Sequence, residues 1–229
     1  TECYSVGRDS EMQGMNFHQY VLGVYSLYDR LTHRFPNILF ESCSSGGARF
    51  DPGILYFAPQ GWTSDDTDAI ERLKIQYGTS YVYPISSMGA HVSAVPNQQV
   101  GRITPIETRA NVAYFGAFGY ELDLNLLSDK EKNKVKEQIS FYKEHRELIM
   151  KGNYYRLLSP FENQDTAWSV VSDDQSKGII GYYKGLNVPN DDWKRLKLQG
   201  LNPNKLYIIN GNPERIHFGD ELMHVGIVI

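Results

Sequence analysis

Apolar side chains recur at steps of three and four residues in several stretches of the chain, which is the spacing of one face of an α-helix. The first such stretch stops at Pro36, because proline cannot continue a helix. The last opens at Ser128, which forms a predicted capping box with Glu131, and another ends at Gly78, a predicted C-cap. The helices predicted in this way are 17–35, 68–77, 107–118 and 128–152.

Short apolar runs between these helices predict buried strands. Ile38–Phe40 and Tyr81–Ile85 are two such runs, and each leads into a loop of small residues. A further apolar run, Gly53–Phe57, ends at Pro59. Strand, loop and helix therefore alternate at least twice before residue 150, which predicts parallel strands joined by crossover helices.

The pattern changes after Tyr154, where short apolar runs are separated by Asn-Pro, Asn-Gly and Gly-Asn turns with no helix between them. We therefore predict a domain boundary near Gly152 and a small antiparallel β-sandwich over 153–229. The α/β part, 1–152, is too short to close a (β/α)8 barrel, which takes about 250 residues. It is expected to be the carboxyl-terminal half of one, with further strands before Thr1. The β-type runs are Ala167–Val171, Ile179–Tyr183, Leu206–Ile209, Ile216–Phe218 and Val225–Ile229.

Composition excludes some classes of function. The net charge of -4 gives no electrostatic case for nucleic-acid binding. No apolar run approaches the length of a membrane span. The two cysteines, Cys3 and Cys43, do not form a disulfide framework, which makes a reducing cytoplasm the expected location. No group of His, Cys and Glu has metal-ligand spacing, so no metal is expected.

Two segments carry the candidate chemistry. The first, Glu41–Asp51, follows an apolar run with small residues and a double glycine, which suits a loop that must approach something closely. The second, Trp62–Asp68, holds three acids and an aromatic ring, and this combination suits sugar chemistry. Asp65 lies just past a predicted strand, where barrel enzymes carry catalytic groups.

Each of these residues also has a purely structural interpretation. Asp65 could be a solvated turn residue, and Asp68 followed by Glu71 fits the N-cap of a helix. Trp62 is either core packing or the wall of a sugar pocket, and Cys43 could be a small buried residue. Arg49 and Asp51 are expected to form an ion pair or to clamp the loop.

The two segments resemble the retaining α-galactosidases of glycoside hydrolase family 36, the melibiases. In that family a Trp-x-Ser-Asp motif carries the proton donor, and the resemblance places this role on Asp65. Relatives carry a loop like Cys-Ser-Gly-Gly-Gly-Gly-Arg-Phe-Asp, in which the residues matching Cys43 and Ser45 line the galactose site, and Trp62 would contact the sugar as well. This chain departs from the loop pattern, because Ser45 and Ala48 stand where those relatives have glycine.

The resemblance implies hydrolysis of terminal α-galactosides of the melibiose and raffinose type by double displacement, with no cofactor. It also implies a homo-oligomer, because relatives are often tetramers. The relatives' Lys-Trp-Asp-x-Asn-Arg nucleophile motif lies upstream of a segment like Thr1-Glu2 and does not occur in this sequence. The isolated chain is therefore expected to be inactive. Two alternatives remain: a galactosyltransferase of the same clan, or a non-catalytic galactoside-binding fragment.

Overall fold

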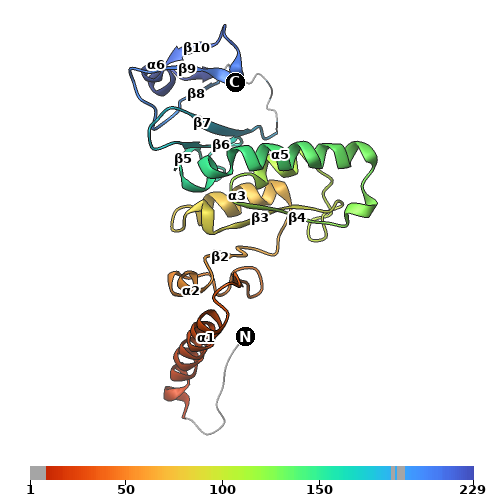
Figure 1. The fold of residues 1–229 in the computed structure, drawn as a ribbon, viewed down its shortest axis with the longest axis vertical. Coiled ribbons are helices and arrows are strands. Elements are labelled where there is room, and N and C mark those ends of the chain that lie inside the picture. Colours follow the sequence, from red (N-terminus) through yellow and green to blue (C-terminus); the bar gives the residue numbers. More distant parts are fainter. Residues whose placement is uncertain (1–8, 187–188, 190–193) are drawn as a thin grey trace. The chain divides into compact units, whose positions relative to one another are not determined.

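The computed structural model describes residues 9–186, 189 and 194–229, so Cys3 lies outside the described part. The chain divides into two compact units, Thr1–Asp65 and Asp66–Ile229 (Figure 1). The boundary predicted near residue 152 falls inside the second unit, between a helix and a strand, and stays a prediction.

From residue 9 onward, the first unit contains a short 3-10 helix, two α-helices and a pair of short strands. Helix α1 confirms the helix predicted over 17–35, and it packs against α2 through ring contacts such as Tyr25 to Phe57, whose centroids are 6.0 Å apart. The predicted strand at 38–40 is wrong. Leu39 is 76% exposed, Phe40 packs edge-on against Tyr28 of α1, and the strand begins one residue later. The elements are η1 Ser10–Met12, α1 Gly14–Arg34, β1 Glu41–Ser42, α2 Pro52–Phe57 and β2 Gln60–Gly61.

The second unit begins with alternating helices and strands. Strands β3 and β4 pair in parallel, from Gly89 opposite Ala117 to Ser93 opposite Glu121, and α4 connects them and packs on β3. This topology confirms the α/β class predicted for this part of the chain. The elements are α3 Ala69–Thr79, η2 Ile85–Ser87, β3 Gly89–Ser93, α4 Ile106–Ala113, β4 Ala117–Glu121, η3 Leu124–Leu126 and α5 Asp129–Lys151.

Several boundaries predicted in this region are wrong. Residues 81–85 form turns and the start of η2, because Pro84 caps a 3-10 turn there, and the strand begins only at Gly89. Helix α4 ends at Ala113, residues 114–116 form a turn, and Ala117 and Phe118 already belong to β4. The C-cap of α3 is Ser80 and not Gly78. The capping box of Ser128 and Glu131 is confirmed, with both reciprocal hydrogen bonds present.

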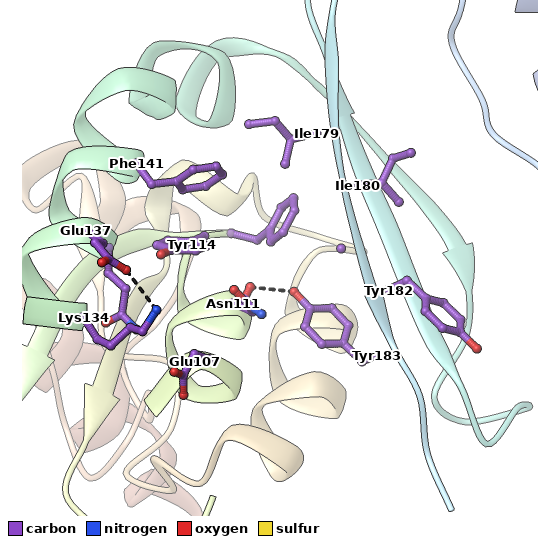
Figure 2. Close-up of a pocket in the computed structure, with 13 residues that line it drawn as sticks. Glu107, Asn111, Tyr114, Lys134, Glu137, Phe141, Ile179, Ile180, Tyr182 and Tyr183 are labelled. Carbon is purple, nitrogen blue, oxygen red and sulfur yellow. Dashed lines mark hydrogen bonds and ion pairs between the residues drawn. The ribbon is translucent and has the colours of Figure 1, made fainter. Parts of the chain in front are cut away.

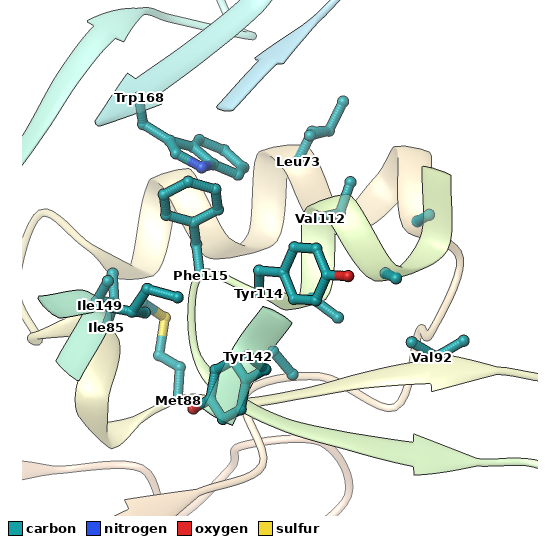
Figure 3. Close-up of a cluster of buried hydrophobic side chains, with 14 of the residues drawn as sticks. Leu73, Ile85, Met88, Val92, Val112, Tyr114, Phe115, Tyr142, Ile149 and Trp168 are labelled. Carbon is teal, nitrogen blue, oxygen red and sulfur yellow. The ribbon is translucent and has the colours of Figure 1, made fainter. Parts of the chain in front are cut away.

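The main hydrophobic core of this unit lies between its helices, strand β3 and one face of strand β6 (Figure 3). Trp168 of β6 is fully buried, and its ring contacts Phe115 edge-to-face at 5.6 Å and Tyr183 at 4.9 Å between centroids. Met88 and Ile149 are likewise fully buried in this cluster. The core therefore joins residues of the barrel-like part to the sheet that follows it.

The remaining strands are antiparallel, as predicted. Strands β5, β6 and β7 form one sheet with β6 in the centre, while β9 pairs with β10 and β8 with β11. Strands β5 and β8 lie outside the predicted apolar runs. The expectation of no helix between these strands is wrong, because the six-residue helix α6 lies between β10 and β11. The elements are β5 Asn153–Leu158, β6 Thr166–Val171, β7 Gly178–Tyr183, β8 Arg195–Leu196, β9 Leu206–Ile208, η4 Ile209–Gly211, β10 Ile216–Phe218, α6 Gly219–His224 and β11 Ile227–Val228.

Candidate active site

The two candidate segments leave neighbouring parallel strands of the first unit. Strands β1 and β2 pair Glu41 with Gln60 and Ser42 with Gly61. The backbone N–H of Trp62 continues this ladder and donates to the carbonyl oxygen of Ser42 at 2.8 Å. Because parallel strands end on the same edge, the loop after Ser42 and the segment after Gly61 emerge side by side.

The loop after β1 packs directly on the backbone that carries Asp65. Ser45, Gly46 and Gly47 all have positive φ angles, of 47°, 65° and 103°. A Cβ atom added to Gly46 would overlap the backbone nitrogen of Asp65, and one added to Gly47 would lie 2.8 Å from the carbonyl oxygen of Thr63. The double glycine is therefore needed both for the backbone conformation and for the close approach of the two segments.

The carboxyl-terminal end of the loop is anchored to helix α1. Asp51 caps α2 by accepting from the backbone N–H of Ile54 at 2.9 Å, and it also accepts a hydrogen bond from the Tyr25 hydroxyl at 2.6 Å. The guanidinium of Arg49 donates to the Tyr20 hydroxyl at 2.5 Å. The expected role of Arg49 and Asp51 as a loop clamp is thus confirmed, with tyrosines of α1 as partners.

The four predicted site residues differ in exposure. Asp65, Ser45 and Cys43 are exposed, and the thiol of Cys43 is free. Trp62 is only 7% exposed, which favours core packing for most of its indole. The structure therefore brings an accessible carboxylate next to a loop that offers a thiol and a hydroxyl, and the role of Trp62 as a sugar contact stays a prediction.

The other two acids of the second segment have structural roles at the start of the second unit. Asp68 is 1% exposed and caps α3, accepting from the backbone N–H groups of Ile70 and Glu71 at 3.0 and 3.1 Å, which confirms the N-cap. It also forms an ion pair with Arg102. Asp66 accepts a hydrogen bond from the backbone N–H of Asp68 at 3.0 Å. Asp65 is therefore the exposed acid of the three.

Within the described ranges, no group of three or more His, Cys, Asp or Glu side chains could hold a metal ion. None of the helices described is long and apolar enough to cross a membrane.

The second unit has an open cavity of about 520 Å³ between α4, α5 and β7 (Figure 2). Phe141 and Ile179 face each other across it, and Lys134 pairs with Glu137 at its polar end at 3.0 Å. Burial raises the pKa of Tyr114 to about 12, so its hydroxyl stays protonated. None of the predicted site residues lines this cavity, and it holds no acid at a strand end.

Comparison with known proteins decides the family. The Melibiase family model matches residues 1–152, and the model of the glycosyl hydrolase family 36 C-terminal domain matches residues 165–229. The chain belongs to glycoside hydrolase family 36. The resemblance seen in the two loop segments is thereby confirmed over nearly the whole chain.

Characterised members of the family are similar along the full length of this chain. It is 53% identical over 229 residues to alpha-galactosidase AgaA of Geobacillus stearothermophilus, covering 100% of this chain and 31% of the relative. It is 46% identical over 226 residues to alpha-galactosidase Mel36A of Lactobacillus acidophilus, covering 99% of this chain and 31% of the relative. The chain thus spans about a third of the length of these family 36 relatives.

Solved structures of the family confirm the predicted fold class. The crystal structure of AgaA superposes with a TM-score of 0.93 at 53% identity, covering 100% of this chain and 32% of AgaA. The alpha-galactosidase of Lactobacillus brevis gives the same TM-score, 0.93, at 53% identity and covers 100% of this chain and 31% of that protein. The fold is part of a (β/α)8 barrel followed by a small antiparallel β domain.

Proposed function

We propose that this chain is the part of a retaining exo-α-galactosidase that supplies the catalytic acid/base, Asp65. One observation carries the proposal. Asp65 is exposed in the segment that follows β2, and its backbone lies against the glycine-containing loop 43–47. A variant of the related AgaA enzyme has been crystallised with raffinose, which supports an α-galactoside oligosaccharide as substrate.

The proposed reaction is a double displacement. Asp65 donates its proton to the glycosidic oxygen while a carboxylate on the opposite face of the sugar attacks the anomeric carbon, and the glycosidic C–O bond breaks. Asp65, now ionised, takes a proton from a water molecule, whose oxygen then displaces the enzyme carboxylate. The motif of the attacking carboxylate does not occur between Thr1 and Ile229, so in this proposal another segment of the polypeptide supplies it. Two carboxylates suffice, and no cofactor takes part.

The remaining predicted site residues contact the galactose in this proposal. Cys43 and Ser45 are exposed residues of the loop 43–47, whose glycines pack on the backbone that leads to Asp65. The exposed part of Trp62 would complete the site. A cytoplasmic location and a homo-oligomeric state are further parts of the proposal. The low cysteine content supports the first, and the family resemblance supports the second.

The stereochemistry of the first product tests the proposed reaction. The complete polypeptide is mixed with 4-nitrophenyl α-galactoside, and the anomeric protons of released galactose are followed by NMR before mutarotation. Two inversions give α-galactose as the first product. If β-galactose accumulates first, the reaction inverts and the double displacement is wrong.

A substitution at Ser45 tests the position of the loop. Ser45 has a φ of 47°, a left-handed conformation that costs a non-glycine residue about 1–2 kcal/mol. Replacing Ser45 with glycine is expected to raise the melting temperature slightly, since the relieved strain outweighs the added chain entropy of about 0.5–1 kcal/mol. It is also expected to change KM for melibiose several-fold, because a hydroxyl beside the sugar is removed.

The matched control is Ala48→Gly, which introduces glycine into the same loop at an exposed position that does not have a positive φ. This change is expected to lower the melting temperature slightly and to leave KM unchanged. Steady-state kinetics and melting curves of both variants are compared. An unchanged KM for Ser45→Gly would mean that Ser45 points away from the sugar.

A further inference from the structure

The β domain of the second unit has a partly open, mainly apolar cavity of about 350 Å³, and none of its lining residues belongs to the candidate active site. It lies among β6, β7, β9 and α6, and Tyr207 forms part of its wall. Most of its wall is aliphatic, contributed by side chains that belong to the second hydrophobic cluster of the chain or pack against it. These include Val171, Ile180, Leu198, Leu201 and Leu222.

Ser169 is the unusual residue of this wall. It lies in the middle of β6, opposite Tyr155 of β5 and Ile180 of β7. Side chains alternate along a strand, so Ser169 faces the same side as Ala167 and Val171, away from the core that holds Trp168. The residue is only 2% exposed, and within the described residues its hydroxyl oxygen has no hydrogen-bond partner.

The other two hydroxyl groups around the cavity are already engaged, while Lys177 and Gln199 are exposed residues of its lining. The Tyr207 hydroxyl donates to the carbonyl oxygen of Gln175 at 2.5 Å and accepts from the backbone N–H of Asn202 at 2.9 Å. The Ser176 hydroxyl donates to the carboxylate of Asp174 at 2.8 Å. Burying a hydroxyl without a partner is costly. Among the described residues that line the cavity, Ser169 has a buried hydroxyl whose hydrogen-bonding capacity is unused.

We propose that this cavity binds a small, mainly apolar molecule that carries one hydroxyl group, such as a simple phenol. The ring would lie among the aliphatic side chains, and its hydroxyl would exchange a hydrogen bond with Ser169. The volume falls in the range of small-molecule sites. A much smaller apolar cavity, of about 150 Å³, already accepts benzene, so a substituted ring fits here.

The test compares p-cresol with toluene, which has the same ring and methyl group but no hydroxyl. Binding to the complete polypeptide is measured by ligand-observed NMR, with saturating galactose present to keep the probes out of the proposed active site. We expect p-cresol to bind about five- to tenfold more tightly than toluene, the effect of one hydrogen bond. Ser169→Ala is expected to abolish this preference, with toluene affinity unchanged, whereas Ser169→Thr keeps a hydroxyl and should retain it.

Ser140→Ala, at an exposed position of α5, is the control for serine loss and should behave like the parent protein. The melting curve of each variant verifies folding. The proposal is overturned if neither probe binds, if the parent shows no preference for p-cresol, or if Ser169→Ala keeps that preference. A crystal soaked with p-cresol that shows only water beside Ser169 would overturn it as well. These outcomes leave the hydrolase proposal untouched, because galactose release is assayed separately.

Discussion

Replacing Asp65 with alanine in the complete polypeptide is expected to lower turnover of melibiose by about 10²–10⁴-fold, the usual contribution of a general acid. The rate of glycosidic bond cleavage in 2,4-dinitrophenyl α-galactoside should fall far less. The reason is that a dinitrophenolate leaves without protonation, while a sugar alkoxide does not. Pre-steady-state and steady-state rates on both substrates measure the difference.

Asp66→Asn is the matched control for this experiment. An asparagine at this position keeps an oxygen that can accept the hydrogen bond now received from the backbone N–H of Asp68. It also removes one negative charge from the position next to Asp65. We expect near-normal rates on both substrates. Equal losses on both substrates in Asp65→Ala, or a leaving-group dependence that appears in Asp66→Asn instead, would remove Asp65 from the acid role.

The second large effect is expected at Trp168, in the core of the second unit. Its side chain is fully buried and contacts the rings of Phe115, Tyr154 and Tyr183. Trp168→Ala should cost about 3–5 kcal/mol, the range for removing a large buried ring. Hydrogen exchange of the β6 amides, followed by mass spectrometry, should show protection reduced by about 10²-fold or more.

Trp168→Phe is the control, because it keeps an aromatic ring against the same neighbours and leaves a smaller gap. Its loss of protection should be clearly smaller. If both variants show the same protection as the parent, the cluster around Trp168 does not hold the sheet to the barrel-like part, and the described core is wrong.

Local chemistry explains why some features could be predicted from the sequence. The capping box of Ser128 and Glu131 and the N-cap of Asp68 depend on groups within three residues of each other, and both are present. The glycines at 46 and 47 signalled a close approach, which the structure places against the backbone of residues 63–65. Features that depend only on residues close together in the sequence can be predicted without knowledge of the fold.

Features that depend on distant partners could not be predicted. The Tyr25 hydroxyl binds Asp51, 26 residues further along, and no local pattern reveals such a contact. The apolar residues at 81–85 resemble a strand, but Pro84 and a 3-10 turn displace the strand to Gly89. The six-residue helix α6 is too short to show a periodic pattern, and the buried state of Trp62 depends on tertiary packing.

The central claim is that Asp65 is the acid/base of a retaining enzyme. The configuration of the product that Asp65→Ala forms in the presence of azide tests this claim most directly. Azide needs no proton removed and can replace water in the second displacement. The account predicts a restored rate on an activated aryl α-galactoside and the formation of α-galactosyl azide, the outcome of two inversions. Formation of β-galactosyl azide would instead make Asp65 the nucleophile. An unrescued rate, with no azide product, would show that Asp65 does not act in the second displacement.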